Sequence, residues 1–417
     1  MSIRMVCSCV LLILNILAAM VGLSAAEEGG KRYSLDEVLV LAEQRNPSLS
    51  VFRANIEAAR GALTSARALP NPELDMELGR GKPLESPGAG YQREQRWGVA
   101  QVLEWPGTRG ARRRAAEARV GVSQAEFGDF QLVLAAQVKE AFFQTLLGQQ
   151  ALSVATQNLT TAQRLVESAR LRVESGEAPE LELIRARVES FNVTRESRRA
   201  RNRLLTVKAA LNSLVGGALG ENFAAVGDLP GLDAAYELAP LIERALATHP
   251  LITSRQKAVQ SAAYTLSEQR QARIPDLTVT GSTGEEIDKR SSALGLTLSV
   301  PLFNQRRGDI AVARAEQARA QAELAQTRLD LTRLITQEYE NYRLAVDQLN
   351  TFEEGLLKQA DEALRIAQLS YEQGELDLLN LLDAQRVQRA TLLEYYEARL
   401  ELHTALARLE RVTGGLQ

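Results

Sequence analysis

Apolar side chains recur at helical spacing over unusually long, proline-free stretches of the chain. Residues 108–175 and 306–373 keep this period for 68 residues each and are interrupted only by glycine. At about 1.5 Å per residue, a helix of that length extends about 100 Å. In the second stretch the apolar positions step by seven, four, seven, four and three, at Leu324, Leu331, Ile335, Tyr342, Val346 and Leu349. This heptad spacing predicts long coiled-coil helices.

Two shorter helical patterns accompany each long one. An earlier helix of about 35 residues is expected over 35–69 and again over 238–273, and a later one over 180–214 and 378–412. Both halves of the chain therefore show the same order of elements.

Four short segments alternate apolar and polar residues with a period of two, which predicts strands at about 72–80, 93–105, 276–283 and 292–301. In the first, three acids (Glu73, Asp75 and Glu77) alternate with three apolar residues (Leu74, Met76 and Leu78). An apolar outer face and a polar or small-residue inner face is the pattern of a transmembrane barrel, with the three acids in its lumen. A half-buried soluble sheet is the alternative.

Two tryptophans support the barrel. Trp97 and Trp105 are eight residues apart, or ~26 Å along a strand and ~19 Å of height at a tilt of ~45°. That separation suits aromatic anchors near opposite membrane interfaces. Because even the smallest membrane barrels have ~8 strands, four strands must be joined by those of other copies, and a trimer supplies twelve.

The chain is a tandem repeat. Asn46-Pro47 and His249-Pro250 are 203 positions apart, whereas Gly176 and Gly374 are 198 apart. We assign repeat 1 to 27–217, an equatorial link to 218–236 and repeat 2 to 237–417, with a helical turn near Gly176 and another near Gly374. The polar loops 80–90 and 285–290 are expected at the cell surface, and the helices in the periplasm.

The N-terminal segment 1–26 has the pattern of a cleaved signal peptide. An apolar run over 10–23 leads to Ser24-Ala25-Ala26. A membrane anchor is the alternative, but the run is shorter than the ~20 residues that a spanning helix needs. Both cysteines, Cys7 and Cys9, lie inside the segment, so we expect a mature protein without disulfides or lipid.

Residues for catalysis or tight metal binding are scarce. Beyond the signal segment the histidines are His249 and His403, with no cysteine, and no zinc or copper ligand spacing occurs. His249 stands before a proline, so a capping or surface role is expected for it. With a net charge of -3 and interspersed basic residues, nothing indicates nucleic acid. We expect no enzyme activity, no cofactor and no metal site.

The signal segment, tandem repeat, strand pairs and long helices together resemble the TolC-like outer membrane factor family. Residues 69–74 and 99–112 resemble the outer membrane component of cobalt–zinc–cadmium efflux systems, the CzcC-like branch. The chain has Gly107-Thr108-Arg109 where Gly-Lys-Arg is typical of that branch. The resemblance implies a homotrimer in the outer membrane, with a twelve-stranded barrel and a periplasmic helical tunnel. It also implies a periplasmic adaptor and an inner-membrane resistance-nodulation-division (RND) pump as partners.

In the family, the helical turns close the periplasmic aperture. Tyr371 and Asp383 match aperture positions, Asp377 lies in the same turn, and Glu182 stands where repeat 1 often has an acid. Leu376 replaces the family's aperture arginine, and Asn380 replaces one aspartate. For each acid, an ordinary solvated surface charge is the alternative.

Three functions are compatible with the sequence. The favoured one is a passive efflux duct for heavy-metal cations. The second is a duct for drugs or for a type I secreted protein. The third is a periplasmic coiled-coil adaptor or scaffold, which leaves the alternating strands unexplained.

Overall fold

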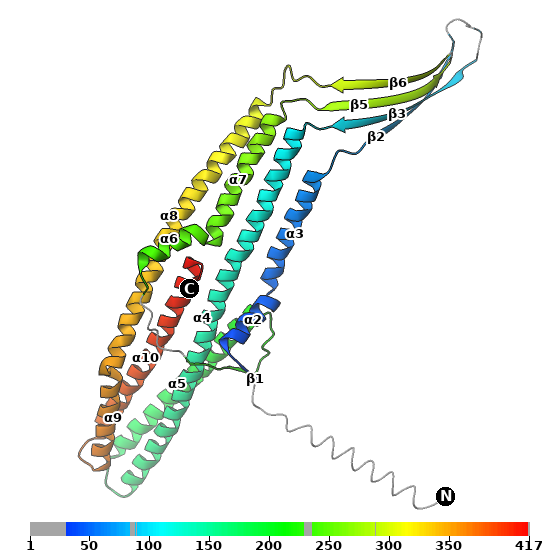
Figure 1. Ribbon diagram of the computed structural model, residues 1–417. Coiled ribbons are helices and arrows are strands. Elements are labelled where there is room, and N and C mark those ends of the chain that lie inside the picture. Colours follow the sequence, from blue (N-terminus) through cyan, green and yellow to red (C-terminus); the bar gives the residue numbers. More distant parts are fainter. Residues whose placement is uncertain (1–30, 84–87, 89, 229–235, 288, 416–417) are drawn as a thin grey trace, which may run out of the picture. The chain divides into compact units, whose positions relative to one another are not determined.

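A computed structural model describes residues 31–83, 88, 90–228, 236–287 and 289–415 (Figure 1). The expected signal segment with Cys7 and Cys9, part of loop 80–90, and part of the link 218–236 lie outside the described residues. The chain forms two compact units, Met1–Arg45 with Val138–Pro230, and Asn46–Gln137 with Gly231–Gln417. Helix α4 (Pro106–Glu174) contributes residues to both.

The first unit combines helices with a small parallel sheet. Its helices are α2 (Leu35–Arg45), the later part of α4, and α5 (Glu180–Leu214). Strand β1 (Lys31–Tyr33) pairs with β4 (Phe223–Ala225). The side-chain amide of Gln149 donates to the carbonyl of Ala225 and accepts from its N–H, both at 2.9 Å. This side chain therefore forms the two backbone hydrogen bonds of Ala225 that a neighbouring strand would otherwise form.

The second unit holds one antiparallel sheet, in the order β2-β3-β5-β6. The strands are β2 (Glu73–Gly81), β3 (Gln92–Leu103), β5 (Leu277–Glu286) and β6 (Lys289–Leu298). The helices are α3 (Pro47–Arg67), the first part of α4, α6 (Leu238–Thr248), α7 (Pro250–Gln271), α8 (Arg307–Thr351), the π-helical η1 (Phe352–Leu356), α9 (Leu357–Glu372) and α10 (Leu378–Thr413). The sheet continues from the ends of α3, α4, α7 and α8 (Figure 1).

The predicted heptad positions form the core of the second unit. Leu331, Ile335, Tyr342 and Leu349 are buried, with Leu324 and Val346 packed against them. Partners from α10, including Leu402 and Leu409, complete the cluster. The coiled-coil prediction for this stretch is confirmed.

The prediction of one 35-residue helix at the start of each repeat is wrong. Helices α2 and α3 are separated at Asn46, and α6 and α7 at His249. Each of these residues is extended, with φ -65° and ψ 121° at Asn46 and φ -61° and ψ 132° at His249. The following proline explains both breaks, because its ring excludes the helical conformation from the preceding residue.

The two long rods differ. Helix α4 runs without a break for 69 residues, so the glycines in this stretch do not interrupt the helix. In repeat 2 the rod passes through η1, where Gly355 has φ 140° and ψ -4°. None of the helices among the described residues is both long enough and apolar enough to cross a membrane.

Candidate functional site

The four-stranded sheet sorts its side chains by polarity. Pairing places Met76 opposite Trp97, and Trp97 opposite Thr283. Two residues along, Leu74 lies opposite Val99, and on β6 Leu294 lies opposite Gly281. Because alternate residues share a face, these positions form one apolar face of the sheet.

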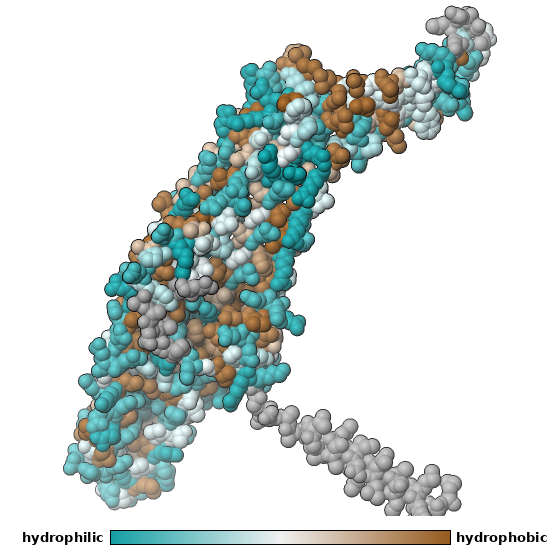
Figure 2. Space-filling model, viewed as in Figure 1, coloured by the Kyte–Doolittle hydropathy of each residue, from teal (hydrophilic) through white to brown (hydrophobic). Residues whose placement is uncertain are grey.

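This apolar face is uncovered. Leu74 is 84% exposed and Leu294 90% exposed. In the space-filling view, hydrophobic residues form a band across the strands beside the helices, and hydrophilic residues follow toward the hairpin turns (Figure 2). Isolated exposed apolar residues are ordinary, but a continuous apolar band indicates contact with lipid or protein.

The opposite face carries the three predicted lumen acids. Glu73, Asp75 and Glu77 are exposed and lie opposite Ala100, Gly98 and Arg96, respectively. The Asp75 carboxylate lies over Gly98, in space that a Cβ at that position would occupy, so a larger residue there would displace this carboxylate. Arg96 also forms an ion pair with Glu286 at 3.2 Å. Alternation along the strand predicts Arg96 on this polar face, but its position opposite Glu77 and its ion pair with Glu286 depend on strand register; the cation balances part of the acidic charge.

The two tryptophans occupy different settings. Trp97 lies inside β3, but the strand ends at Leu103 rather than at Trp105 as predicted. The Trp105 backbone N–H donates to Asp276 at 2.8 Å, and its indole N–H donates to Gln271 at 3.3 Å. The strand stops because Asp276 binds the backbone N–H of Trp105 and α4 begins at the next residue.

A charged pair fixes this transition from strand to helix. The guanidinium of Arg112 donates to both carboxylate oxygens of Glu104, at 2.8 and 2.7 Å. This hydrogen-bonded cation lowers the pKa of Glu104 below its ordinary value. Bidentate pairs of this kind hold a defined geometry.

The two helical turns share one backbone arrangement. Gly176 has φ 79° and Gly374 has φ 76°. The carbonyl of Arg172 accepts from residues 177 and 178 at 2.8 and 3.2 Å, and the carbonyl of Ser370 accepts from residues 375 and 376 at 2.9 and 3.2 Å. Both turns therefore end the preceding helix with a left-handed glycine.

The side chains at the turns differ. At the first turn, Glu182 is an ion-pair partner of Arg172 at 2.8 Å, with 12% of its side chain exposed. At the second turn, the Asp377 side chain caps α10 by accepting from Asn380 N–H at 3.0 Å. The position equivalent to Asp377 in repeat 1 is Pro179, which offers no side-chain cap.

The other predicted aperture residues are also placed at the second turn. Tyr371 is 8% exposed near the end of α9. Asp383 is exposed on α10 and forms an ion pair with Arg386. The structure thus brings Tyr371, Gly374 and Asp377 into one turn, with Asp383 about one and a half helical turns into α10.

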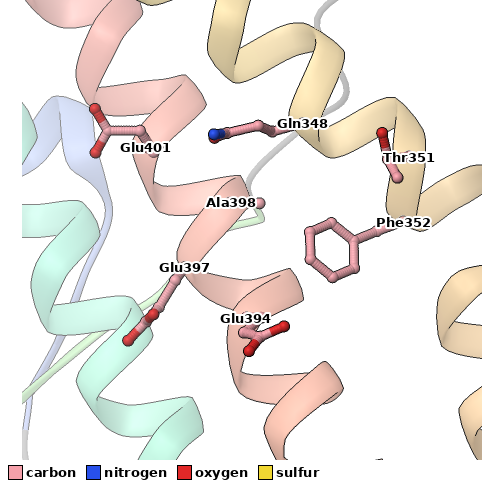
Figure 3. A pocket seen from close by; sticks show the side chains of 7 residues that line it. All are labelled: Gln348, Thr351, Phe352, Glu394, Glu397, Ala398 and Glu401. Atoms are coloured by element: carbon pink, nitrogen blue, oxygen red, sulfur yellow. The ribbon is translucent and has the colours of Figure 1, made fainter.

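A surface groove of about 440 Å³ lies between α10 and the junction of α8 with η1 (Figure 3). It is lined by Gln348, Thr351, Phe352, Glu394, Glu397, Ala398 and Glu401. Within the described part of the chain, no group of three or more metal-ligating side chains is arranged to hold an ion.

Comparison with known proteins identifies the fold. The outer membrane efflux protein family matches residues 38–217 and 241–415. The cobalt–zinc–cadmium resistance protein CzcC of Cupriavidus metallidurans is 27% identical, covering 91% of this chain and 90% of its own. The nickel and cobalt resistance protein CnrC of the same organism is 29% identical, covering 68% and 67%.

The solved structure of CusC has the same fold, with a TM-score of 0.79 at 17% identity, covering 94% of this chain and 96% of its own. The predicted fold class, mainly helical with membrane strands as in TolC-like channels, is confirmed. The chain belongs to the outer membrane efflux protein family, whose members are passive outer-membrane ducts and not enzymes.

Proposed function

We propose that three copies of this chain form the outer-membrane exit duct of an RND-type efflux system. The four-stranded sheet carries this proposal. Strands β2 and β6 are its two edges, and the sheet exposes an apolar face. Unpaired strand edges cannot lie in a bilayer, because lipid offers their N–H and C=O groups no partners. Pairing β2 of each copy with β6 of the next closes twelve strands into a barrel.

The barrel then orients the rest of the molecule. Its apolar face contacts lipid, with Trp97 and Trp105 near the interfaces, and its lumen receives Glu73, Asp75 and Glu77. The hairpin turns lie at the cell surface and the long helices in the periplasm. The chain reaches the outer membrane through the cleaved signal 1–26 and carries no lipid.

Engineered disulfides test the closure. The chain has two cysteines, Cys7 and Cys9, both in the segment that we expect to be removed, so introduced cysteines are the sole thiols of the mature protein. Met76→Cys on β2 would be combined in turn with Ser292→Cys, Leu294→Cys and Leu296→Cys on β6. In at least one register, oxidation should yield covalent trimers that dissociate under reduction. Pairing Met76→Cys with Val51→Cys on α3 is the control and should give monomers. Monomers in every register would contradict the barrel.

We propose the helical turns as the periplasmic aperture. Gly176 and Gly374 form the turns, and Glu182, Tyr371, Asp377 and Asp383 are the side chains that hold them closed. In planar bilayers, Tyr371→Ala combined with Asp383→Ala should raise the closed-state conductance. Leu329→Ala, an exposed position on α8, is the control. An unchanged closed-state conductance in the double variant would show that Tyr371 and Asp383 do not hold the aperture closed.

We propose heavy-metal cations as the cargo. The support is the relatives' names, a cobalt–zinc–cadmium resistance protein and a nickel and cobalt resistance protein. An acidic lumen favours cations through its potential, and conduction needs weak sites rather than tight ligands. An adaptor and an RND pump supply selectivity and energy.

A sensitivity panel tests the cargo. Deleting the gene should lower tolerance to zinc, cobalt, cadmium or nickel by at least severalfold, and the gene on a plasmid should restore it. Sensitivity to drugs with unchanged metal tolerance would favour the drug-efflux alternative instead.

A further inference from the structure

The apolar face of the sheet ends in a basic rim at the turn of the first hairpin. The rim consists of Arg80, Lys82 and Arg93 with Tyr91. Arg80 continues the row of Leu74, Met76 and Leu78 on β2, and Arg93 continues the row of Val99 and Trp97 on β3, because alternate residues share a face. All four rim residues are exposed.

Strand register and one side-chain contact bring the rim residues close together in two pairs. Arg80 lies directly opposite Arg93 in the β2–β3 register. The ammonium group of Lys82 lies 4.7 Å from the centroid of the Tyr91 ring. Like charges directly opposite each other in a sheet repel, so the pairing of Arg80 with Arg93 is unfavourable without an anion nearby.

Among the described residues, no carboxylate neutralises these cations. Neither Arg80 nor Arg93 has an ion pair with any of them. Glu94 is on the other face, where its carboxylate lies over Gly79 and Gly81. Glu285 is on the rim's face, opposite Gln95, but it is engaged by Arg290 at 3.2 Å.

The second hairpin differs at the corresponding depth. There the outward charges are Glu285 and Arg290, which lie opposite each other and form an ion pair. This pair neutralises itself, whereas among the described residues of the first hairpin three outward cations lack an ion pair. The excess positive charge is therefore local to one hairpin and directly borders an apolar band.

We propose that Arg80, Lys82 and Arg93 bind the phosphate groups of lipid headgroups in the leaflet that surrounds the hairpin turns. This inference rests on the proposed membrane orientation. A phosphate placed between Arg80 and Arg93 accepts charge-assisted hydrogen bonds from both guanidinium groups. The acyl chains of the lipid that carries this phosphate then lie along Leu78 and Met76, and Tyr91 takes the interfacial position typical of tyrosine. A free phosphate ion can bind the same cations, but it has no acyl chains to contact the apolar residues.

Lipid binding by the reconstituted mature protein tests the proposal. Wild type and Arg80→Gln/Arg93→Gln would be placed in phosphatidylcholine vesicles with diphosphoryl lipid A at a series of concentrations, and association would be followed by energy transfer from Trp97 and Trp105 to a labelled lipid. The double variant should bind about tenfold more weakly, a loss of about 1.4 kcal/mol. Arg290→Gln, which removes a cation already paired with Glu285, is the matched control and should stay within about twofold of wild type.

Three results would overturn the proposal. They are equal binding by wild type and the double variant, an equal loss in Arg290→Gln, and displacement of the lipid by millimolar inorganic phosphate, which indicates an ion site instead. Vesicle flotation separates this inference from the proposed function. If wild type does not float with vesicles, the membrane duct itself is wrong. If all variants float equally but the double variant keeps its lipid affinity, the rim proposal alone fails.

Discussion

The two repeats keep the same turns and differ in what surrounds them. Gly176 and Gly374 have nearly the same φ, and the same carbonyls accept the same turn hydrogen bonds at both sites. Around this shared backbone, repeat 1 places an ion pair between Arg172 and Glu182, whereas repeat 2 uses the Asp377 cap. A left-handed glycine is enough to specify the turn, so the surrounding side chains are free to take different roles.

The same contrast recurs at the proline breaks. Asn46 caps α3 through its side-chain oxygen, which accepts from Ser48 N–H at 2.8 Å. His249 caps α7 through Nδ1, which accepts from Leu251 N–H at 3.1 Å, and its Nε2 lies 3.1 Å from the carbonyl of Arg411. Repeat 2 thus makes the cap part of a buried contact with α10.

The largest predicted difference concerns these two caps. His249→Ala should lower the free energy of unfolding by about 3 kcal/mol, because it removes both hydrogen bonds and leaves a cavity at a residue only 3% exposed. Asn46→Ala should cost less, though at least the ~1 kcal/mol of the lost cap, because the asparagine side chain is smaller than imidazole and leaves a smaller cavity at a residue 8% exposed. Thermal unfolding of the detergent-solubilised protein measures both. His249→Asn, which can retain the cap alone, should fall between them; equal losses for the two alanine variants would contradict the asymmetry.

The two rods are the next comparison. Gly355→Ala should destabilise repeat 2 by about 1–3 kcal/mol, because φ 140° is a conformation that L-residues rarely adopt. The equivalent position in repeat 1 is Gln157, within the unbroken α4. Gln157→Ala should therefore change the melting temperature little. A stabilising effect of Gly355→Ala would show that η1 readily converts to an ordinary helix.

Ion pairs at the turns should have smaller and unequal effects. Arg172→Gln leaves the carboxylate of Glu182, 12% exposed, without this cation and should cost about 1–2 kcal/mol. Arg386→Gln breaks an exposed pair with Asp383 and should cost at most about 0.5 kcal/mol. Protease cleavage rates at the two turns report local opening. Faster cleavage at the second turn in Arg386→Gln than at the first in Arg172→Gln would reverse the expected order.

The smallest effect is a pH dependence near the His249 cap. Burial raises the pKa of Asp129, and the positive charge of Arg411 offsets part of this increase. Since the folded pKa exceeds the unfolded value of about 3.9, this group stabilises the fold least when ionised. Its contribution is most favourable below the unfolded pKa and declines as pH rises to the raised folded value.

Asp129→Asn should therefore stabilise the protein above that window, by less than about 1 kcal/mol, because the side chain is 31% exposed and solvent screens its charge. The difference from wild type should shrink as pH falls, and unfolding curves at several pH values measure it. Destabilisation by Asp129→Asn at neutral pH would mean that the carboxylate contributes a favourable interaction.

The spacing of apolar residues along the chain is enough to predict most of the helices and strands. The coiled-coil rods and the alternating strands follow from residue spacing, and constant offsets revealed the repeat. Periodicity failed at Asn46 and His249, because the apolar pattern continues across a proline that breaks the helix. The Arg172–Glu182 pair could not be expected, since the partners are ten residues apart across a turn. The opposition of Arg80 and Arg93 likewise depends on strand register, which alternation alone does not determine.

The subunit count of the membrane-extracted protein tests the central claim most directly. Native mass spectrometry of material solubilised from the outer-membrane fraction should show three mature chains in one particle. Recovery of the mature chain as a monomer in the soluble periplasmic fraction would contradict the duct.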